Sequence, residues 1–372
     1  MIDPEMIPSQ VRMCSACPKM CRHVCPTFFA WRSDSPTPHG RALLIHQEIM
    51  GTRQLDERGI EVLYQCLECS HCLTWCLPEI DIAEIVEHRR TMLVRNGQYP
   101  VGLDSMVANV VEHHNPFGEP HSERTDWIRV KPNKGKRIAY FTGCTSAYRE
   151  KEIAKSTVEL LHTLGFDVVL PDEWCCGSPL LRTGFVDIGL EQASHNAEVL
   201  NSLEVEEIVA TCPGCYRTLK NDYAKLGLEL DVPVRHISEF LEEHIADLNF
   251  GEFDGKFTFH DPCHLGRHMG VYDSPRKVIQ HVTRSKVIEM ERHGDNAMCC
   301  GNGAGMRLLW PEKAKVIGSE RIRQAKDIDA NVLVTACPFC KNLLVSQSDN
   351  EMKVIDLPEL ALMAIEKKNA HT

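Results

Sequence analysis

The chain has 372 residues, of which 43% are hydrophobic, and its formal net charge is −11. This length predicts two or three domains whose cores are large enough to fold without cross-links. The acidic balance argues against a protein that binds nucleic acid, and the lack of a long apolar run or an N-terminal signal pattern predicts a cytoplasmic chain that spans no membrane.

Cysteine is the outlier in the composition, with 18 residues, about 5% of the chain. Thiols stay free in a reducing compartment, so we expect most of these cysteines to be metal or cluster ligands. They fall without remainder into two sets of four followed by two sets of five. In chain order the sets are Cys14, Cys17, Cys21 and Cys25; Cys66, Cys69, Cys72 and Cys76; Cys144, Cys175, Cys176, Cys212 and Cys215; and Cys263, Cys299, Cys300, Cys337 and Cys340.

The N-terminal segment, residues 1–100, holds both sets of four. These sets bracket a predicted helix over 41–50 that ends at Gly51, and a second helix is predicted over 80–94. The second set has the Cys-x2-Cys-x2-Cys-x3-Cys spacing of bacterial ferredoxin loops, in which three thiolates wrap one [4Fe–4S] cubane. The first set has one residue more between its second and third cysteines. The segment therefore predicts a domain with two cubanes, and a pair of Zn(Cys)4 sites is the alternative.

Two-cluster ferredoxins share ligands between their loops, because the fourth cysteine of each loop binds the other cluster. By this analogy, the fourth cysteine of each set binds the cluster that is held by the other three cysteines of the opposite set. The ligand groups are then Cys14, Cys17, Cys21 and Cys76 for one cubane, and Cys66, Cys69, Cys72 and Cys25 for the other.

A predicted connector over 101–135, with Pro, Gly and Asn in HHNPFGEPH and KPNKGK, leads into an internal repeat. Cys144 and Cys263 are 119 residues apart, and the later cysteines of the two sets of five are offset by 124 and 125 residues. These offsets indicate a duplication of roughly 120 residues, with copies over 136–248 and 249–372.

Strands and helices alternate within each copy, which predicts an α/β fold with parallel sheets covered on both faces. Strands are predicted over 137–142, 166–170, 207–211, 257–260 and 331–335, and helices over 150–164 and 186–201. The cysteines follow the carboxyl ends of these strands, where open parallel sheets place their ligands. Three loops that carry one, two and two thiols can therefore converge on one site per copy.

Other interpretations of the repeated cysteines are open. Cys212-Pro-Gly-Cys215 and Cys337-Pro-Phe-Cys340 have the form of thioredoxin-like redox motifs, but this interpretation leaves the other thiols of each copy unexplained. Five thiols also exceed the need of a tetrahedral zinc site. A larger iron–sulfur cluster therefore fits each copy better.

Several polar residues and one glycine-rich stretch lie near the second set of five. His260, His264 and His293 are either proton donors or hydrogen-bonded loop residues. Arg267 and Arg307 either attract an anionic substrate or face solvent. The stretch 301–305 (GNGAG) does not satisfy the dinucleotide-binding spacing, so we interpret it as a close approach of the backbone to a cluster.

The repeated motifs resemble a known family. GCTSAYR, WCCGSP and TCPGC resemble one CCG domain, and HDPCHLGR, MCCGNGAG and TACPFC resemble a second. The order of two quartets and two CCG domains resembles the D subunit of heterodisulfide reductase. It also resembles the iron–sulfur subunits of glycolate oxidase and of anaerobic glycerol-3-phosphate dehydrogenase. SPTPHGRALL and NPFGEP look like the same group, so the resemblance covers almost the whole chain.

The resemblance implies a helical ferredoxin-like domain followed by two Rossmann-like CCG domains. Each complete set of five thiolates is taken in this family to hold a noncubane [4Fe–4S] cluster, which adds two noncubane clusters to the two cubanes. It further implies an electron-transfer subunit of an anaerobic, hetero-oligomeric oxidoreductase. A flavoprotein partner would lie on one side and a membrane cytochrome or quinone-linked subunit on the other, and these partners would hold the chain at the inner face of the membrane.

Two alternatives are carried forward. The chain can itself be the catalytic subunit, which reduces a disulfide at a CCG cluster in two one-electron steps. It can also be a zinc-stabilised scaffold without redox activity.

Overall fold

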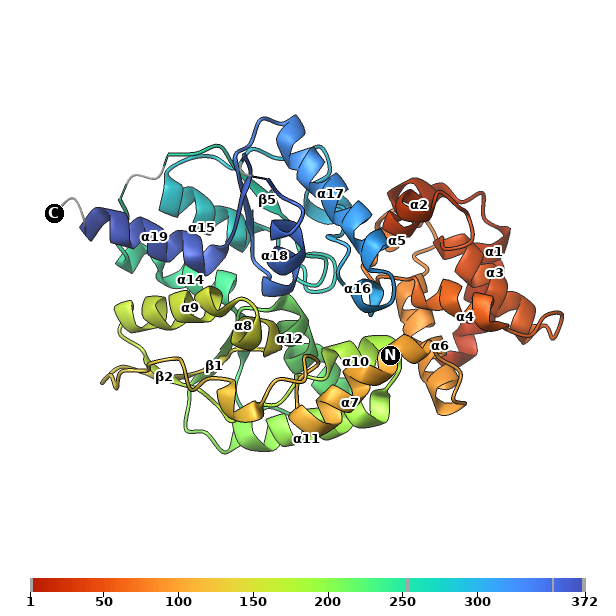
Figure 1. The fold of residues 1–372 in the computed structure, drawn as a ribbon, viewed down its shortest axis with the longest axis horizontal. Helices are drawn as coiled ribbons and strands as arrows, with labels where there is room; N and C mark the ends of the chain where they lie inside the picture. The colour runs from red at the N-terminus through yellow and green to blue at the C-terminus, as the bar shows by residue number, and fades with distance from the viewer. Residues whose placement is uncertain (1–2, 252–253, 350, 370–372) are drawn as a thin grey trace.

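The computed structural model describes residues 3–251, 254–349 and 351–369, and it consists of a helical N-terminal region followed by two α/β units (Figure 1). The predicted fold class is confirmed, because each α/β unit is built on a sheet whose paired strands are all parallel. Among the described residues, no helix combines the length and the apolar character needed to cross a bilayer.

The N-terminal region is a set of short helices whose starts are fixed by polar caps. The Thr37, Asp56 and Asp81 side chains each accept a hydrogen bond from a backbone N–H in the first turn of the helix that follows. Two of these helices, α3 and α6, confirm the helices predicted over 41–50 and 80–94. The elements are η1 Pro4–Met6, α1 Ile7–Ala16, η2 Met20–Val24, α2 Pro26–Trp31, α3 Pro38–Ile49, α4 Glu57–Tyr64, α5 His71–Thr74 and α6 Ile82–Arg95.

The predicted connector is more ordered than its sequence indicates. It contains a ten-residue helix, α7 (Asp104–His113), whose Met106 and Val110 side chains are buried, and the short turns η3 (Val101–Leu103) and η4 (His121–Glu123). The flanking Pro and Gly residues led to the prediction of an irregular segment. They lie outside the helix, which ends where His114 takes a positive φ of 57°.

The first α/β unit has a four-stranded parallel sheet in the order β2-β1-β3-β4. Its strands β1 and β3 and helices α9 and α11 confirm the predicted elements, whereas β4, a three-residue strand after Pro233, was not predicted. The elements are β1 Arg137–Phe141, α8 Cys144–Tyr148, α9 Lys151–Thr163, β2 Asp167–Val169, α10 Ser178–Thr183, α11 Val186–Asn201, β3 Glu207–Ala210, α12 Pro213–Arg217, η5 Thr218–Asp222, α13 Tyr223–Lys225, β4 Val234–His236, α14 Ile237–His244 and η6 Ile245–Asp247.

The second unit repeats the plan with a three-stranded parallel sheet, β5-β6-β7, of which β7 was not predicted. At the place of β2, the segment before Met290 makes a backbone hydrogen bond from Ile288 N to Phe257 O (2.8 Å) but forms no strand. The elements are β5 Phe257–His260, α15 Asp273–Thr283, η7 Gly294–Asn296, α16 Met306–Leu309, α17 Pro311–Asp327, β6 Val332–Thr335, α18 Pro338–Val345, β7 Lys353–Asp356 and α19 Leu357–Asn369.

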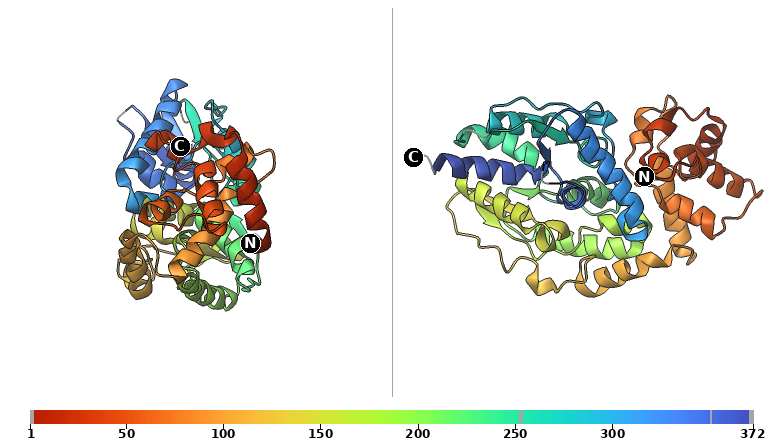
Figure 2. Two further views of the ribbon diagram at one scale, coloured as in Figure 1. Left: turned by 90° about the vertical axis from the view of Figure 1, so that its right-hand side faces the viewer. Right: turned by 45° about the horizontal axis from the view of Figure 1, so that its top comes forward.

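The two units pack on each other through equivalent helices. Helix α9 packs on α19, and α14 packs on α15 (Figures 1 and 2). Helices α9 and α15 are the long helices that follow the first strand of each unit, and α14 and α19 are the last α-helix of each unit. The two contacts are therefore reciprocal. Buried residues of both sheets, such as Phe141 and Phe259, belong to one continuous apolar core. The carboxyl ends of the two sheets therefore face a common region.

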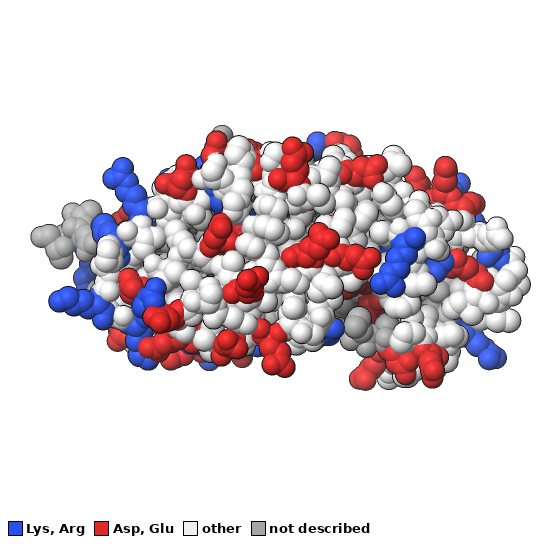
Figure 3. Space-filling view, turned by 90° about the horizontal axis from the view of Figure 1, so that it is seen from below, with Lys and Arg blue, Asp and Glu red and all other residues white. Residues whose placement is uncertain are grey.

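The N-terminal region contacts both units. Helix α2 packs on α17 of the second unit, and α6 packs on α10 of the first. On the face seen in Figure 3, acidic side chains are scattered among uncharged residues, and basic side chains lie mostly toward the two ends of the molecule. The contacts of α2 and α6 place the N-terminal cysteines next to those of the α/β units.

Candidate functional site

The cysteines of the α/β units stand where strands end and helices begin. Cys144 opens α8 after β1, and Cys212 precedes α12 after β3. In the second unit Cys337 caps α18, because its Sγ accepts a hydrogen bond from Cys340 N (3.3 Å). Cys337 N in turn donates to Asp356 Oδ2 at the end of β7 (2.8 Å). The unpredicted strand β7 thus helps to fix a thiol.

All ten cysteines of the two sets of five line one cavity of about 590 Å³. Sequence analysis predicted one site per copy. In the structure the two sites open into a shared space, and the thiols of Cys212 and Cys337 are hydrogen-bonded to each other across the boundary between the units. A small molecule in this cavity can therefore reach both sets of thiols.

The quartets of the N-terminal region interdigitate. The neighbours that raise the pKa of the Cys14 thiol to about 12, after burial itself, are Cys21, Cys76 and Cys17. Burial also raises the pKa of the Cys72 thiol, and its thiol neighbours are Cys66, Cys21, Cys69 and Cys25. The fourth cysteine of each quartet therefore lies beside the other quartet.

One thiol pair connects the N-terminal region to the second unit. Cys69 is hydrogen-bonded to Cys299, which lowers the pKa of the Cys69 thiol to about 6. The pKa of the Cys299 thiol is raised by its neighbours Cys263, Cys300 and Cys69. Arg267 fixes the loop between the two thiols, since its Nε donates to Cys69 O (2.6 Å) and its Nη1 donates to Ala297 O (2.7 Å). This half-buried arginine binds backbone carbonyls, whereas the sequence left it as either a substrate-binding or a solvent-facing residue.

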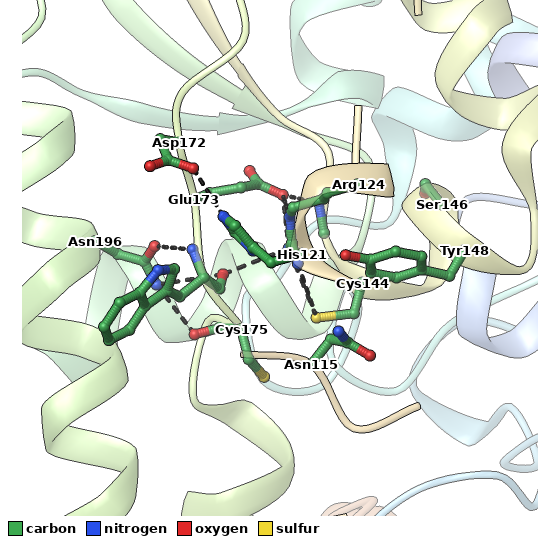
Figure 4. Close-up of polar contacts among 12 residues, drawn as sticks. Asn115, His121, Arg124, Cys144, Ser146, Tyr148, Asp172, Glu173, Cys175 and Asn196 are labelled. Atoms are coloured by element: carbon green, nitrogen blue, oxygen red, sulfur yellow. Dashed lines mark hydrogen bonds and ion pairs between the residues drawn. The ribbon is translucent and has the colours of Figure 1, made fainter. Parts of the chain in front are cut away.

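A buried guanidinium contacts the first set of five (Figure 4). Arg124, from the segment after α7, donates from Nη2 and Nη1 to Cys144 Sγ (3.6 and 3.7 Å). It is paired with Glu173, whose Oε1 also accepts from Gly143 N (2.7 Å). Burial raises the pKa of the Glu173 carboxyl. Nothing in the sequence around Arg124 marks it, because its partners are 20 and 49 residues away.

The other polar residues near the second set divide into lining and structural roles. His264 and Arg307 line the cavity, and the Arg307 guanidinium donates to Asn342 Oδ1. His293 faces Met290 O through Nδ1 (2.7 Å), which fits the interpretation as a hydrogen-bonded loop residue.

The glycine-rich stretch after Cys300 serves two purposes. A Cβ at Gly301, which has φ +100°, would lie 2.7 Å from Ala314 O of α17, so this glycine permits helix packing. Gly303 and Gly305 line the cavity. We predicted that the backbone of 301–305 comes close to a cluster. In the structure Gly301 approaches helix α17, and Gly303 and Gly305 approach the cavity.

The donor sets suit iron–sulfur clusters. All 18 cysteines are free thiols, gathered in groups and mostly buried. Burial and the neighbouring thiols together raise the pKa of Cys14 and Cys21 to about 12. Such groups carry thiolate charge only when a metal centre compensates it, and soft thiolates select iron–sulfur clusters or zinc. Sets of five exceed a tetrahedral zinc site.

Comparison with known proteins agrees with this chemistry. The Cysteine-rich domain family, CCG, matches residues 138–220 and 257–345, the cores of the two α/β units. A hypothetical protein from Helicobacter pylori has the same fold, with a TM-score of 0.59 at 14% identity over 90% of this chain and 69% of that one. Two CCG domains that share a thiol-lined cavity beside two cysteine quartets define an iron–sulfur subunit of an oxidoreductase complex.

The curated relatives narrow this class. The chain is 34% identical to the D subunit of the dihydromethanophenazine:CoB–CoM heterodisulfide reductase of Methanosarcina acetivorans, over 94% of this chain and 92% of the relative. The D subunit of the Methanosarcina barkeri enzyme is 36% identical over 95% of this chain and 92% of the relative. The chain belongs to the family of heterodisulfide reductase D subunits.

A more distant relative differs in its named activity. The B subunit of the fumarate reductase (CoM/CoB) of Methanothermobacter marburgensis is 33% identical over 82% of this chain and 62% of the relative. The two kinds of relative are thus named as subunits of different oxidoreductases.

Proposed function

We propose that the chain holds four [4Fe–4S] clusters. One cubane is bound by Cys14, Cys17, Cys21 and Cys76, and the other by Cys25, Cys66, Cys69 and Cys72. The two sets of five each hold a noncubane cluster. The interdigitated quartets support this exchange of fourth ligands, because Cys76 lies beside Cys14 and Cys25 lies beside Cys72. The quartets form a ferredoxin-like domain over 1–100, joined through 101–135 to CCG domains over 136–248 and 249–372.

The four clusters form a series. The cubane that includes Cys69 meets the second CCG set at Cys299, and the second CCG set meets the first through Cys337 and Cys212. The cubane that includes Cys17 is farthest along this chain of contacts from the shared cavity. Bound clusters supply one-electron steps at potentials set by hydrogen bonds, charge and burial, so such a series can carry electrons through one chain.

The substrate that this arrangement fits best is a disulfide, bound in the cavity that both CCG sets line. This shared cavity is the observation on which the assignment depends. Reduction of the disulfide takes up two electrons and two protons, breaks the S–S bond and yields two thiols. The names of the Methanosarcina relatives pair dihydromethanophenazine with the CoB–CoM heterodisulfide, which is a disulfide of two different thiols. The fumarate reductase relative, named for the two thiols, supports the same site working in the opposite direction.

A series of one-electron carriers needs a donor and an acceptor, so the electrons must come from and go to partners. We propose a hetero-oligomeric complex with a flavoprotein subunit on one side and a membrane cytochrome or quinone-linked subunit on the other. These partners would hold the cytoplasmic chain at the inner face of the membrane. The exposed side chains of Met13, Met20 and Leu77 lie close in sequence to the ligands of the outer cubane and support electron entry there.

Metal analysis of the protein purified without oxygen tests the cluster assignment. We expect about sixteen irons and a similar amount of inorganic sulfide per chain. Stoichiometric zinc with little iron would establish the scaffold alternative instead.

Spectroscopic titration of the reduced protein tests the catalytic assignment. Added disulfide should reoxidise the clusters and perturb the electron paramagnetic resonance (EPR) signal of a CCG cluster, and an equal concentration of the matching thioether should do neither. If disulfides leave every cluster signal unchanged, the chain only conducts electrons and the substrate binds to a partner.

A further inference from the structure

The two CCG units differ at the residue that ends their first strand. Cys144 and Cys263 correspond in the repeat, and three residues before them stand Phe141 and His260. Both side chains are completely buried. Phe141 is an apolar core residue, whereas His260 places a polar ring beside the second set of thiols. A buried imidazole needs partners for both ring nitrogens.

The partner of one ring nitrogen is unambiguous. Arg321 of α17 donates from Nε to His260 Nδ1 (3.1 Å). A guanidinium has only donors, so Nδ1 must be the acceptor. Arg321 is also completely buried and is held in place through Arg292 O (2.7 Å) and Gln324 Oε1 (2.9 Å). The neutral imidazole is therefore fixed as the tautomer with its hydrogen on Nε2.

The other ring nitrogen faces sulfur. The ring of His260 and the sulfur atoms of Cys300 and Cys340 lie within 4.8 Å of one another. The buried Nε2 makes no hydrogen bond to any other group among the described residues, so the neighbouring Cys300 sulfur is an acceptor within reach of its hydrogen. This trio has the composition of a metal site, but a nitrogen that carries hydrogen cannot be a ligand. Such a nitrogen can donate to a thiolate instead, which leaves the five cysteines as the ligand set.

We propose that His260 donates a hydrogen bond from Nε2 to the Cys300 thiolate and thereby raises the reduction potential of the cluster held by the second CCG set. This inference rests on the proposed function, since it concerns a cluster that the set would bind. A hydrogen bond to a ligand sulfur withdraws electron density and favours the reduced, more negative state. His260 is a positioning and tuning residue and does not touch substrate.

The location of His260 gives this tuning a purpose. The second set meets the cubane ligand Cys69 through Cys299, next to Cys300. A higher reduction potential of the cluster in the second set favours electron transfer to it from the neighbouring cubane. The first set has a different donor, Arg124, whose charge is balanced by Glu173. The two halves of the cavity are therefore electrostatically unequal although their ligands are duplicated.

Redox titration of the full chain, purified without oxygen and followed by EPR and visible spectra, tests the proposal. His260→Phe introduces the residue of the first copy at this position. We expect the midpoint potential of one cluster to fall, while the other three midpoint potentials and the iron content stay at the wild-type values. His260→Gln keeps an N–H donor and should restore part of the shift. Phe141→Leu, at the matching position of the first unit, is the control and should leave all four potentials unchanged.

A second measurement does not depend on the His260 variants. After exchange into deuterated water, the reduced second cluster of the wild type should show a coupling to an exchangeable deuteron, and Arg321→Met, which frees the tautomer, should weaken this coupling. Unchanged potentials in His260→Phe with full iron content would overturn the proposal, and so would loss of about four irons in that variant, which would make His260 a ligand. These outcomes differ from failure of the proposed function, in which the wild type itself lacks redox-active iron.

Discussion

Arg124 illustrates how single residues support the thiol sites, because it joins a buried carboxylate to a thiol. It forms an ion pair with Glu173 in which both side chains are at most 3% exposed. A buried pair contributes little compared with an apolar pair of the same shape, but removal of one partner leaves an uncompensated buried charge. The Arg124–Glu173 pair is therefore sensitive to a single substitution.

Arg124→Met should lower the free energy of unfolding by about 3–5 kcal/mol, since it leaves Glu173 buried without its cation. Urea unfolding without oxygen, followed by circular dichroism, measures this loss. The double variant Arg124→Met/Glu173→Gln removes the charge and keeps an acceptor for Gly143 N, so it should recover part of the loss. A double variant that is less stable than the single one would contradict this account.

The loss in Arg124→Met should also depend on pH. Burial already raises the pKa of the Glu173 carboxyl in the wild type, and removal of the guanidinium raises it further. A carboxyl whose pKa is higher in the folded state stabilises the protein below its unfolded pKa, and this stability is lost as pH rises through the folded pKa. The deficit of the variant should therefore be smaller at pH 5 than at pH 8, and the opposite trend would exclude Glu173 as the cause.

Arg307 of α16 is the cavity arginine that we expect to bind an anionic group of the substrate. Arg149 and Arg182, which also line the cavity, form ion pairs with Glu119 and with Glu87 and Asp222. The partner of Arg307 is the neutral side chain of Asn342. Its charge is thus available to a carboxylate, phosphate or sulfonate.

Arg307→Met should raise KM for an anionic disulfide by roughly 10- to 100-fold, which corresponds to the loss of one hydrogen bond to a charged group. The assay uses a reduced dye as electron donor, and iron content should remain unchanged. Arg323→Met removes an exposed arginine of helix α17 that does not line the cavity, and it is the control. An equal KM for wild type and Arg307→Met would place the anion-binding group elsewhere.

At this scale the sequence predicted the chemistry of the cysteines better than that of their neighbours. The 18 thiols divide into sets by spacing alone, because the quartet loops are short and the sets of five repeat at nearly constant offsets. Arg124 and Arg321 were not predicted, since each reaches its partner from a different element. Arg307 and Arg267 were each weighed as either a substrate-binding or a solvent-facing residue, and only the structure separates Arg307, which lines the cavity, from Arg267, which binds backbone carbonyls.

At the scale of elements, helices α6 and α10 join the N-terminal region to the first unit through an unusually close contact. Arg90 of α6 donates to Arg182 O at 2.7 Å and is paired with Glu68, which lies in the loop of the second quartet. Gly184, which ends α10 at φ +94°, lies against the backbone of Arg90, and a Cβ there would lie 2.5 Å from its carbonyl carbon. This position requires glycine for both its conformation and its contact.

Gly184→Ala should destabilise the protein by more than the roughly 1 kcal/mol that a non-glycine residue costs at a positive φ. The matched control is Gly97→Ala, since Gly97 also has a positive φ (+68°) but nothing lies within 4 Å of its Cβ position. Thermal unfolding of both variants separates the conformational cost from the cost of the contact. Equal melting temperatures would show that α6 and α10 can move apart freely.

The elements that were not predicted are either too short to show a periodic pattern or surrounded by residues typical of loops. Strands β4 and β7 are three and four residues long, which is too short for an alternating pattern to be distinguished from a loop. Helix α7 is surrounded by Pro and Gly residues that dominate a coarse inspection of 101–135. The long helices α9 and α11 were predicted almost residue by residue, since their apolar spacing persists over several turns.

At the scale of the whole molecule, duplication explains why a chain with two CCG units has one cavity. The reciprocal contacts of α9 with α19 and of α14 with α15 turn the carboxyl ends of the two sheets toward each other. Sequence analysis predicted the duplication but treated the copies as independent, because spacing along a chain does not reveal how two copies pack. The packing brings Cys212 and Cys337 together and leaves the quartets on one side of the shared cavity.

This one-sided arrangement predicts the order of electron flow. Cys72→Ala should remove the cubane that touches the second CCG set, and Cys17→Ala should remove the outer cubane. Each variant should retain about twelve irons per chain.

When the reduced proteins are mixed with a disulfide and frozen at intervals for EPR, the remaining inner cubane of Cys17→Ala should be reoxidised as fast as in the wild type. The outer cubane of Cys72→Ala should stay reduced far longer, because its link to the CCG sets through Cys69 and Cys299 is lost. Equally fast reoxidation of the outer cubane in Cys72→Ala would mean that it reaches the cavity by a separate route, and the clusters would then not act in series.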